Sequence, residues 1–394
     1  MNLVYVFLRP GKPQVYGGEK SMIITAQGAA ARGHRVRCLV TARDDLLHEI
    51  ERAGLEVEVV DGIDPIAGLR KATARDIGRR LTTIARLNKR VFELVSEERP
   101  AIVHVSGVPA VVTTLPGAKL AGGAVVYHVR DTSRTGDTRW YEELCVLAAD
   151  RSVAISESLR ARILETARPA ARRAMSRRLV AIYNGFDFAE MDAFCASVTR
   201  EDARASLSIG ADEMLAVSVG AVNEKKGQLR FIERALSRAV ATTPKLRMVF
   251  IGGVNDEGYA GRCKVALART GLTHHVQFVG YAPQAITYRW LRAAEIGVVA
   301  SSREGLSRFA VEAHAFGLPV VSTRIVGPVD VVVDGTTGYL IDEASIERMG
   351  DTIAELAADA ALRARLGAAA SSHVRKKFVL DRHHDEIAKL YASI

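Results

Sequence analysis

The chain has 394 residues, of which 48% are hydrophobic and 25% are charged. This size and composition exclude a disordered or small disulfide-stapled protein and favour two globular domains, each with its own core. The net charge of +9 favours anionic ligands. The basic clusters contain no interleaved aromatic residues and no nucleic-acid-binding motif occurs, which argues against a nucleic-acid partner.

The first apolar run, Leu3–Leu8, has no basic segment before it and ends at Arg9-Pro10. It is therefore predicted to be the first strand and not a signal peptide. No apolar run approaches the length that spans a bilayer. The four cysteines show no paired spacing and are expected to be reduced. We expect a cytoplasmic protein, and peripheral contact with the inner face of the membrane stays open.

Short β-branched runs alternate with helical stretches, which is typical of parallel sheets covered by helices on both faces. A first series of strands is expected at Leu3–Leu8, Val36–Val40, Val57–Val60, Ile102–Val105, Ala124–Tyr127, Ser152–Ile155 and Leu179–Ile182. A second series is expected at Met214–Val219, Leu246–Ile251, Val276–Val279, Ile296–Ala300, Pro319–Ser322 and Tyr339–Ile341. The sequence thus predicts an α/β protein with two doubly wound, Rossmann-like domains facing a central cleft, with ligands at the carboxyl ends of the strands.

The predicted linker is the polar stretch Asp192–Arg200, which follows the turn at Asn184-Gly185. The expected domains are therefore residues 1–195 and 196–375. Residues 376–394 are expected to form a C-terminal helix that packs back toward the first domain.

The most informative segment runs from Ser301 to Val321. A helix is expected to begin at Ser307, a good N-cap residue, and to end at Gly317. Its first turn supplies free N–H groups and a positive dipole, which suit a phosphate group. Glu304 precedes this helix and Glu312 lies within it, and carboxylates accept hydrogen bonds from ligand hydroxyls.

Glu304 and Glu312 resemble the Glu-x7-Glu signature of the family-4 retaining glycosyltransferases, which adopt the GT-B fold. Further motifs that resemble this family follow in chain order: Gly17-Gly18, Arg32-Gly33-His34-Arg35-Val36, Asn184-Gly185-Phe186-Asp187, Gly220 with Lys226-Gly227, Phe278-Val279-Gly280 and Gly335-Thr336-Thr337-Gly338-Tyr339-Leu340. The resemblance is close over roughly residues 215–345 and scattered in the first half of the chain.

The resemblance implies roles for four side chains. Lys226 would neutralise the diphosphate of a nucleotide-sugar donor, Glu304 would bind the transferred sugar, and Glu312 would bind the ribose hydroxyls. His128 would lie near the donor sugar and the reacting centre. The alternatives without function are a surface lysine, two surface acids and a strand-end histidine with a structural role. We expect a structural role for His104 and a packing or surface role for His314.

The resemblance also implies contacts from backbone amides near the sugar and phosphates, at Gly17, Gly18, Gly305, Leu306 and Ser307. One position departs from the family, because Ala221 follows Gly220 where arginine is usual. The candidate replacements for that cation are Lys225, Arg303 and Arg308. No Asp-x-Asp pair occurs, so we expect no metal and no cofactor beyond the nucleotide diphosphate-sugar co-substrate.

Two basic clusters and three further arginines are candidates for anion binding. They comprise Arg70, Lys71, Arg75, Arg79, Arg80, Arg86, Lys89 and Arg90, then Arg160, Arg162, Arg168, Arg172, Arg173, Arg177 and Arg178, and finally Arg130, Arg134 and Arg139. Cations near an anionic membrane contribute about 1 kcal/mol each. The clusters predict contact with an anionic membrane or a charged acceptor, with solvated helix faces as the alternative.

Together these patterns predict a metal-independent retaining glycosyltransferase. Its second domain would bind the donor, and its first domain would bind an acceptor that is anionic, lipid-linked, a saccharide or another small molecule. A sugar-nucleotide epimerase and a phosphorylase on the same fold stay open, although a phosphorylase would need a pyridoxal phosphate lysine. A catalytically silent nucleotide-sugar-binding protein is the third alternative, and Ala221 is its main argument.

Overall fold

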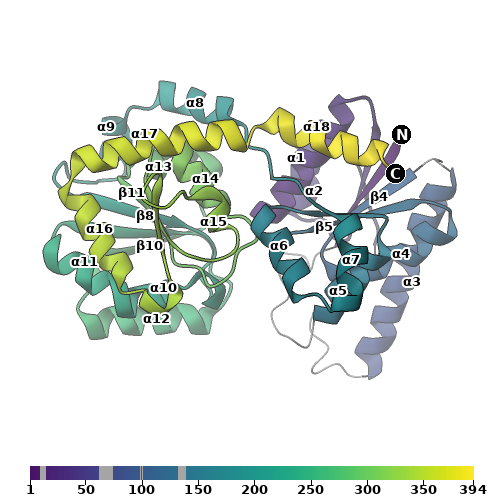
Figure 1. The fold of residues 1–394 in the computed structure, drawn as a ribbon, viewed down its shortest axis with the longest axis horizontal. Coiled ribbons are helices and arrows are strands. Elements are labelled where there is room, and N and C mark those ends of the chain that lie inside the picture. Colours follow the sequence, from purple (N-terminus) through teal and green to yellow (C-terminus); the bar gives the residue numbers. More distant parts are fainter. Residues whose placement is uncertain (9–14, 62–73, 98, 100, 132–138) are drawn as a thin grey trace. The chain divides into compact units, whose positions relative to one another are not determined.

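The computed structural model describes all residues except 9–14, 62–73, 98, 100 and 132–138 (Figure 1). The side chains at 74–77, 79, 80 and 139 also lie outside the description. Seven side chains of the predicted basic clusters therefore lie outside the described residues, namely those of Arg70, Lys71, Arg75, Arg79, Arg80, Arg134 and Arg139.

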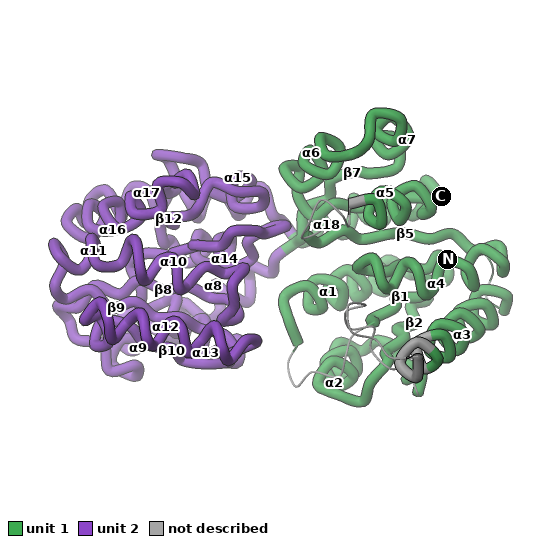
Figure 2. Tube along the Cα trace, turned by 90° about the horizontal axis from the view of Figure 1, so that it is seen from below, with its two compact units in different colours: residues 1–185, 380–394 green, residues 186–379 purple. Residues whose placement is uncertain are grey.

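The chain forms two compact units, residues 1–185 with 380–394, and residues 186–379 (Figure 2). The chain first passes from one unit to the other after Gly185, and not in the predicted linker Asp192–Arg200. That stretch lies in the second unit, where the helix α8 (Phe188–Ser197) begins at Asp187, whose side chain accepts from the backbone of residues 189 and 190. Its polar residues belong to the exposed face of a helix, which composition alone does not distinguish from a linker.

The first unit contains one parallel sheet with the strand order β3-β2-β1-β4-β5-β6-β7. Its strands are β1 (Asn2–Phe7), β2 (Arg35–Val40), β3 (Glu56–Val59), β4 (Ala101–Ser106), β5 (Ala124–Val129), β6 (Arg151–Ala154) and β7 (Leu179–Ala181). The helices are α1 (Gly17–Ala31), α2 (Asp45–Arg52), α3 (Ala74–Glu97), α4 (Val108–Leu120), α5 (Arg139–Ala148), α6 (Glu157–Thr166), α7 (Pro169–Arg178) and α18 (Leu380–Ala392). All seven predicted strands are present.

Both faces of this sheet are buried. Along β1 the side chains of Leu3 and Tyr5 point to one face and Val4 and Val6 to the other, and all four are at most 1% exposed. Such strands are continuous apolar runs, because helices cover them on both sides. A ligand can therefore approach this sheet at the ends of its strands.

The last helix of the chain, α18, completes the core of the first unit. Ile387 and Tyr391 belong to the same buried cluster as Leu3 and Tyr5 of β1. Gly28 of α1 permits close contact with α18, because a Cβ at that position would lie 2.1 Å from the His384 ring. Residues 380–394 thus supply part of a core whose remainder comes from the first 185 residues.

The second unit contains a parallel sheet with the order β10-β9-β8-β11-β12-β13. Its strands are β8 (Met214–Val219), β9 (Leu246–Ile251), β10 (Val276–Gly280), β11 (Ile296–Val299), β12 (Val320–Thr323) and β13 (Gly338–Ile341), which agree with the six predicted strands. The helices, besides α8, are α9 (Arg200–Ser206), α10 (Gln228–Phe231), α11 (Ser237–Thr242), α12 (Glu257–Thr270), α13 (Gln284–Ala293), α14 (Arg308–Ala315), α15 (Pro328–Val331), α16 (Arg348–Ala358) and α17 (Ala360–Lys377).

In each sheet the strand order reverses its direction at one position, which is called the switch point. In the first unit it lies between β1 and β4, and in the second between β8 and β11. The loops after these strands leave the carboxyl edge in opposite directions and open a crevice where ligands bind in doubly wound folds. Within the described ranges, no helix combines the length and hydropathy of a membrane span.

Candidate active site

In the second unit, the loops after β8 and β11 meet at the switch point. The loop after β8 leads through Gly220 to a single 3-10 turn at Glu224–Lys226, and the loop after β11 leads from Ala300 to Ser307. The backbone N–H of Ser302 donates to the carbonyl of Lys225 at 2.9 Å. Two segments that are about 75 residues apart are therefore joined where the fold predicts a ligand site.

The two predicted charged residues of these loops form an ion pair. Lys226 Nζ lies 2.6 Å from Glu304 Oε1, and the hydroxyl of Ser301 donates to the same oxygen at 2.9 Å. The Glu304 side chain is 8% exposed and that of Lys226 is 26% exposed. Burial raises the pKa of Glu304, but the charges of Lys226 and Lys225, together with the hydrogen bonds from Lys226 and Ser301, leave the pKa below its ordinary value. Glu304 is therefore an ionised, nearly buried carboxylate.

Three glycines allow this close arrangement. A Cβ on Gly220 would lie 2.9 Å from Lys226 Cε, so the lysine stem passes directly over the glycine. Gly227 has a φ of +71° and a Cβ there would lie 2.1 Å from the carbonyl oxygen of Ala300. A Cβ on Gly327 would lie 3.0 Å from Glu304 Cβ. Sequence reasoning missed Gly327, although its Gly-Pro dipeptide is a turn signal.

The predicted helix after Glu304 is present as α14. Ser307 is its N-cap and accepts from the N–H of Ala310 at 3.4 Å, and Gly317 follows the helix with a φ of +77°. The start and end of this helix are thus confirmed. The backbone of Gly305, Leu306 and Ser307, the predicted sugar and phosphate contacts, forms the turn between Glu304 and the helix.

Glu312, the second acid of the pair, lies on α14 and is 15% exposed. Its Oε1 is 3.4 Å from a guanidinium nitrogen of Arg308, one turn earlier. The Arg308 guanidinium also lies 4.6 Å above the ring of Phe186. Arg308 is therefore held beside Glu312, at the start of the helix.

The three candidate replacements for the usual arginine differ in position. Arg308 lies beside Glu312, and Arg303 is in the loop with Glu304. The charge of Lys225 lowers the pKa of Glu304, so its ammonium acts on the Lys226–Glu304 pair. Lys225 is thus a candidate whose charge acts on Glu304.

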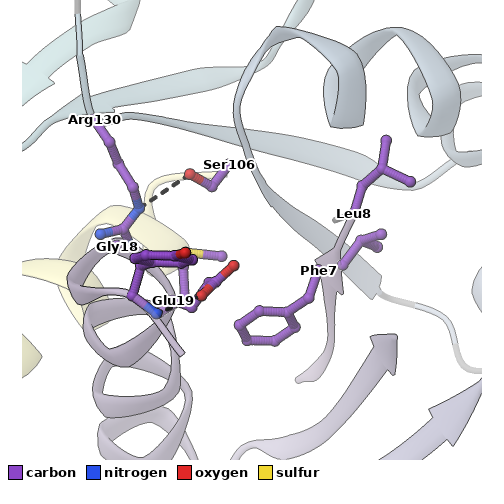
Figure 3. Close-up of a pocket in the computed structure, with 9 residues that line it drawn as sticks. Phe7, Leu8, Gly18, Glu19, Ser106 and Arg130 are labelled. Atoms are coloured by element: carbon purple, nitrogen blue, oxygen red, sulfur yellow. Dashed lines mark hydrogen bonds between the residues drawn. The ribbon is translucent and has the colours of Figure 1, made fainter. Parts of the chain in front are cut away.

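A cavity of about 220 Å³ lies at the switch point of the first unit (Figure 3). Its lining comes from the end of β1, the start of α1 and the residues that end or follow β4 and β5: Val6, Phe7, Leu8, Tyr16, Gly18, Glu19, Met22, Ser106 and Arg130. The Arg130 guanidinium donates to the hydroxyl of Ser106 at 3.0 Å, as the dashed line in Figure 3 shows. Among the described residues, the lining thus includes one cation, Arg130, one carboxylate, Glu19, and two residues with a hydroxyl, Ser106 and Tyr16.

The predicted glycines Gly17 and Gly18 open α1 at this cavity. A Cβ on Gly18 would lie 3.5 Å from Arg130 Cδ, so the glycine is in contact with the arginine stem. Glu19 accepts from the backbone N–H of Tyr16 at 2.7 Å and places a carboxylate at the same helix end. Sequence reasoning missed Glu19 and did not distinguish Arg130 from the other two arginines of its segment.

His128 lies in β5 one residue before the end of the strand, and it is fully buried. Its Nδ1 is 3.1 Å from His104 Nε2, while its Nε2 has no hydrogen-bond partner among the described residues. Burial, followed by the charge of Arg130, holds the pKa of His128 well below its ordinary value. His128 is therefore an uncharged imidazole with one open nitrogen.

His314 has the structural role that its helix position suggested. It is fully buried on α14, and its Nδ1 donates to the carbonyl oxygen of Leu318 at 3.0 Å. In the part of the chain that the structure describes, no group of three or more His, Cys, Asp or Glu side chains could hold a metal ion.

Two family models match the chain in succession. Residues 15–190 match Glycosyltransferase Family 4, and residues 199–373 match Glycosyl transferases group 1. Two curated relatives are each 31% identical over 190 residues: a D-inositol 3-phosphate glycosyltransferase of Streptomyces avermitilis and the lipopolysaccharide core biosynthesis glycosyltransferase LpsE of Rhizobium meliloti. These matches cover 46% and 48% of this chain, and 40% and 53% of the relatives.

Solved structures resemble the whole chain in fold. HepE of Anabaena, crystallised with UDP and glucose, has a TM-score of 0.80 at 18% identity, with all of both chains covered. A glycosyltransferase of Rickettsia africae has a TM-score of 0.80 at 17% identity, covering all of this chain and 98% of that one.

These features define a glycosyltransferase of the GT-B fold. The chain belongs to family 4 of these enzymes, as its motifs predicted.

Proposed function

We propose that this protein is a retaining glycosyltransferase that moves a hexose or related sugar from a nucleotide diphosphate-sugar to a hydroxyl-bearing acceptor, without an obligatory metal. The observation that carries the proposal is the pairing of Lys226 with Glu304 at the switch point of the second sheet, beside the start of α14. A cation, a carboxylate and the backbone N–H groups of a helix start are groups that suit a sugar diphosphate.

The site would work by exchange of partners. In the structure, the Lys226 ammonium is bound to Glu304. When the donor binds, the ammonium would move to the diphosphate and Glu304 would accept hydrogen bonds from sugar hydroxyls. Negative charge that develops on the leaving phosphate would then be stabilised by Lys226 and by the N–H groups of the first turn of α14. Glu312 would hold the ribose hydroxyls.

Retention is proposed from the family resemblance, with attack on the face that the leaving group departs from. The leaving phosphate would help to accept the proton of the acceptor hydroxyl, so that no protein carboxylate forms a covalent bond with the sugar. The family matches do not favour the epimerase or the silent-binding alternative.

The first unit is proposed to bind the acceptor. Its cavity combines Arg130, Glu19 and Ser106, which could bind both an anionic group and hydroxyls of a saccharide or polyol. HepE was crystallised with UDP-glucose, and one curated relative is named for D-inositol 3-phosphate. These names support a nucleotide-sugar donor and an acceptor rich in hydroxyls, and the presence of Arg130 in the cavity supports an anionic group on the acceptor.

We also propose that the first unit contacts an anionic membrane at the cytoplasmic side. On α5, the side chains of Trp140, Tyr141 and Leu144 are between 37% and 49% exposed, and the two rings stack at 3.5 Å. The neighbouring α7 presents the exposed Arg173 and Arg177, which have no side-chain partner among the described residues. Aromatic side chains beside arginines suit the headgroup region of an anionic bilayer.

The proposal is tested by measuring release of nucleoside diphosphate from UDP-, GDP-, ADP- and dTDP-sugars. We expect slow release from one donor, lost in Lys226→Ala and Glu312→Ala and retained in Lys264→Ala, which removes an exposed lysine elsewhere in the second unit. A donor that raises the melting temperature without turnover would direct the search to the acceptor. The proposal would be contradicted if no donor released nucleotide and no donor raised the melting temperature.

A further inference from the structure

The second unit begins at Phe186, and several contacts hold the ring of this residue in place. Its backbone N–H donates to the carbonyl of Phe378 at 3.0 Å, and the two rings meet edge to face at 6.3 Å. Phe186 is 2% exposed. The guanidinium of Arg308, on α14, lies 4.6 Å from the centre of the Phe186 ring. The ring is therefore a fixed support for the arginine.

Arg308 is held by this ring more than by its neighbour on the helix, Glu312. One guanidinium nitrogen lies 3.4 Å from Glu312 Oε1, which is long for a hydrogen bond. An arginine four residues before a glutamate is also the less favourable order for such a pair on a helix. A guanidinium binds an aromatic ring more strongly where water is excluded, and the Arg308 side chain is only 23% exposed above a buried ring. The Phe186 ring thus sets where the guanidinium lies, and from there the guanidinium contacts the Glu312 carboxylate.

The carboxylate of Glu312 needs such a contact to fix its orientation. The last side-chain torsion of a glutamate is broad and roughly two-fold, so it does not by itself fix the plane of the carboxylate. Two vicinal hydroxyls of a ribose can each donate to one carboxylate oxygen, and both bonds form only when this plane is turned correctly. The contact of Arg308 with Oε1 restrains the torsion. This contact therefore bears on how Glu312 meets a ribose.

Tyr288 of α13 is a second group near Glu312 and a rival for this role. Burial, followed by the charges of Glu312 and Glu190, raises the pKa of Tyr288. The Tyr288 hydroxyl accepts a hydrogen bond from Gln284 at 2.5 Å, which anchors it within its own helix. Arg308 contacts the carboxylate oxygen itself, and this favours Arg308 over Tyr288.

We infer that Phe186 and Arg308 are positioning residues for Glu312. The ring holds the guanidinium, and the guanidinium turns the carboxylate so that it accepts from the two vicinal hydroxyls of a ribose. The inference rests on the proposed function, which supplies its ligand, a nucleoside diphosphate. All three residues belong to the second unit. The residue at which the chain enters this unit thereby takes part in nucleotide binding.

The contribution of the ribose hydroxyls is measured by calorimetric titration of the full-length protein with UDP, GDP and ADP and with their 2′,3′-dideoxy counterparts. We expect the wild-type protein to bind one ribonucleotide about tenfold or more tightly than its dideoxy counterpart, because bonds to a carboxylate are lost. Phe186→Leu removes the support, and Arg308→Lys keeps the charge but loses the flat group that stacks. Each should reduce the preference about threefold or more by weakening ribonucleotide binding. Binding of the dideoxy nucleotide should stay unchanged, because it keeps the diphosphate and lacks the hydroxyls.

Phe188→Leu is the matched control. The Phe188 ring also lies beside an arginine of the second unit, with the Arg375 guanidinium 5.2 Å from its centre, and that arginine pairs with Asp192. This variant should keep the wild-type preference for the ribonucleotide. Tyr288→Phe removes only the hydroxyl of the rival group and should keep the preference too.

A double variant tests whether the effect passes through the carboxylate. Glu312→Ala should lose the preference for the ribonucleotide, and addition of Phe186→Leu should lower it no further. Thermal unfolding checks that each variant is folded, and Arg308→Lys carries the test if Phe186→Leu is not.

The inference and the proposed function fail in different ways. The inference fails if Phe186→Leu and Arg308→Lys keep the wild-type preference, or if they weaken ribonucleotide and dideoxynucleotide binding equally. It also fails if Tyr288→Phe alone loses the preference, or if the wild-type protein binds both nucleotides equally. In each of these cases nucleotide still binds and the proposed function stands. If no nucleoside diphosphate binds the wild-type protein, both fail.

Discussion

The ammonium of Lys226 lies 2.6 Å from the carboxylate of Glu304, so the two charged groups proposed to bind opposite ends of a sugar diphosphate are bound to each other. Ser301 and the charge of Lys225 hold the same carboxylate ionised. The nearly buried carboxylate thus keeps the ammonium in place. The exchange of partners proposed above starts from this pair.

Separating this pair should affect nucleotide binding and turnover in opposite directions. Glu304→Gln releases Lys226 from its partner, so we expect the free nucleoside diphosphate to bind at least as tightly as to the wild-type protein, while turnover falls. Lys226→Ala removes a charge-assisted bond of about 1.5–3 kcal/mol and should weaken nucleotide binding tenfold or more. Calorimetric titration measures both, with thermal unfolding as the control for folding. Equal weakening in the two variants would contradict the exchange of partners.

The family usually has an arginine at the position of Ala221. Substitution of Arg308 tests whether its guanidinium supplies the missing charge. It stacks on Phe186 and pairs with Glu312, so Arg308→Ala should lower turnover about tenfold if its charge also reaches the diphosphate. Arg303→Ala and Lys225→Ala are compared in the same assay. If Arg308→Ala retains full turnover while Lys226→Ala abolishes it, Arg308 is not the replacement.

Activity should be independent of divalent metal. Lys226 and the amides at the start of α14 are proposed to stabilise the charge that metal-dependent transferases neutralise with a cation. Nucleotide release by protein treated with EDTA and then desalted should equal that of untreated protein. Loss of activity that magnesium or manganese restores would show that a metal participates.

Binding to anionic vesicles should depend on α5 and α7. Each exposed arginine near an anionic surface contributes about 1 kcal/mol, so Arg173→Glu with Arg177→Glu should reduce cosedimentation strongly. Trp140→Ser with Leu144→Ser should reduce it through loss of apolar insertion.

Two substitutions in the second unit serve as controls for these variants, Val265→Ser at an exposed apolar residue and Arg348→Glu at an exposed arginine. Equal cosedimentation with neutral and anionic vesicles would exclude the proposed surface.

The stability of the second unit should fall in mild acid in a way that depends on His314. Burial lowers its pKa to about 4, whereas an unfolded histidine has a pKa near 6.5. The unfolded state therefore takes up the proton first, and stability is lost as pH falls from about 6.5 toward 4. Between pH 7 and pH 5 this costs about 2 kcal/mol.

His314→Asn keeps a donor for the Leu318 carbonyl but does not titrate, so its unfolding free energy should fall by about 2 kcal/mol less over the same pH range. Denaturant unfolding at the two pH values measures the difference. Parallel pH dependences of the variant and the wild-type protein would show that His314 is not the group responsible.

The parts of the site that sequence reasoning found are those with local signals. Ser307 caps α14 because a serine side chain accepts from the N–H three residues later, and Gly317 ends that helix with a positive φ. The parts that it missed are contacts between distant segments. Gly327 packs on Glu304, and Glu19 shares the cavity with Arg130. The Gly-Pro turn signal and the Gly17-Gly18 motif beside them do not show which distant residue each one meets.

The thirteen strands of the described residues, the capped helix after Glu304 and the family could be predicted from local patterns, because buried strands are apolar runs and helix ends carry specific residues. The division into units and the contacts between distant side chains could not, because they depend on long-range packing. The last fifteen residues return to the first unit because α18 buries Ile387 and Tyr391 against its sheet. That packing brings Tyr391 to Tyr5 across 386 positions of the chain. Such contacts depend on how helices cover a sheet, and no local pattern of residues encodes them.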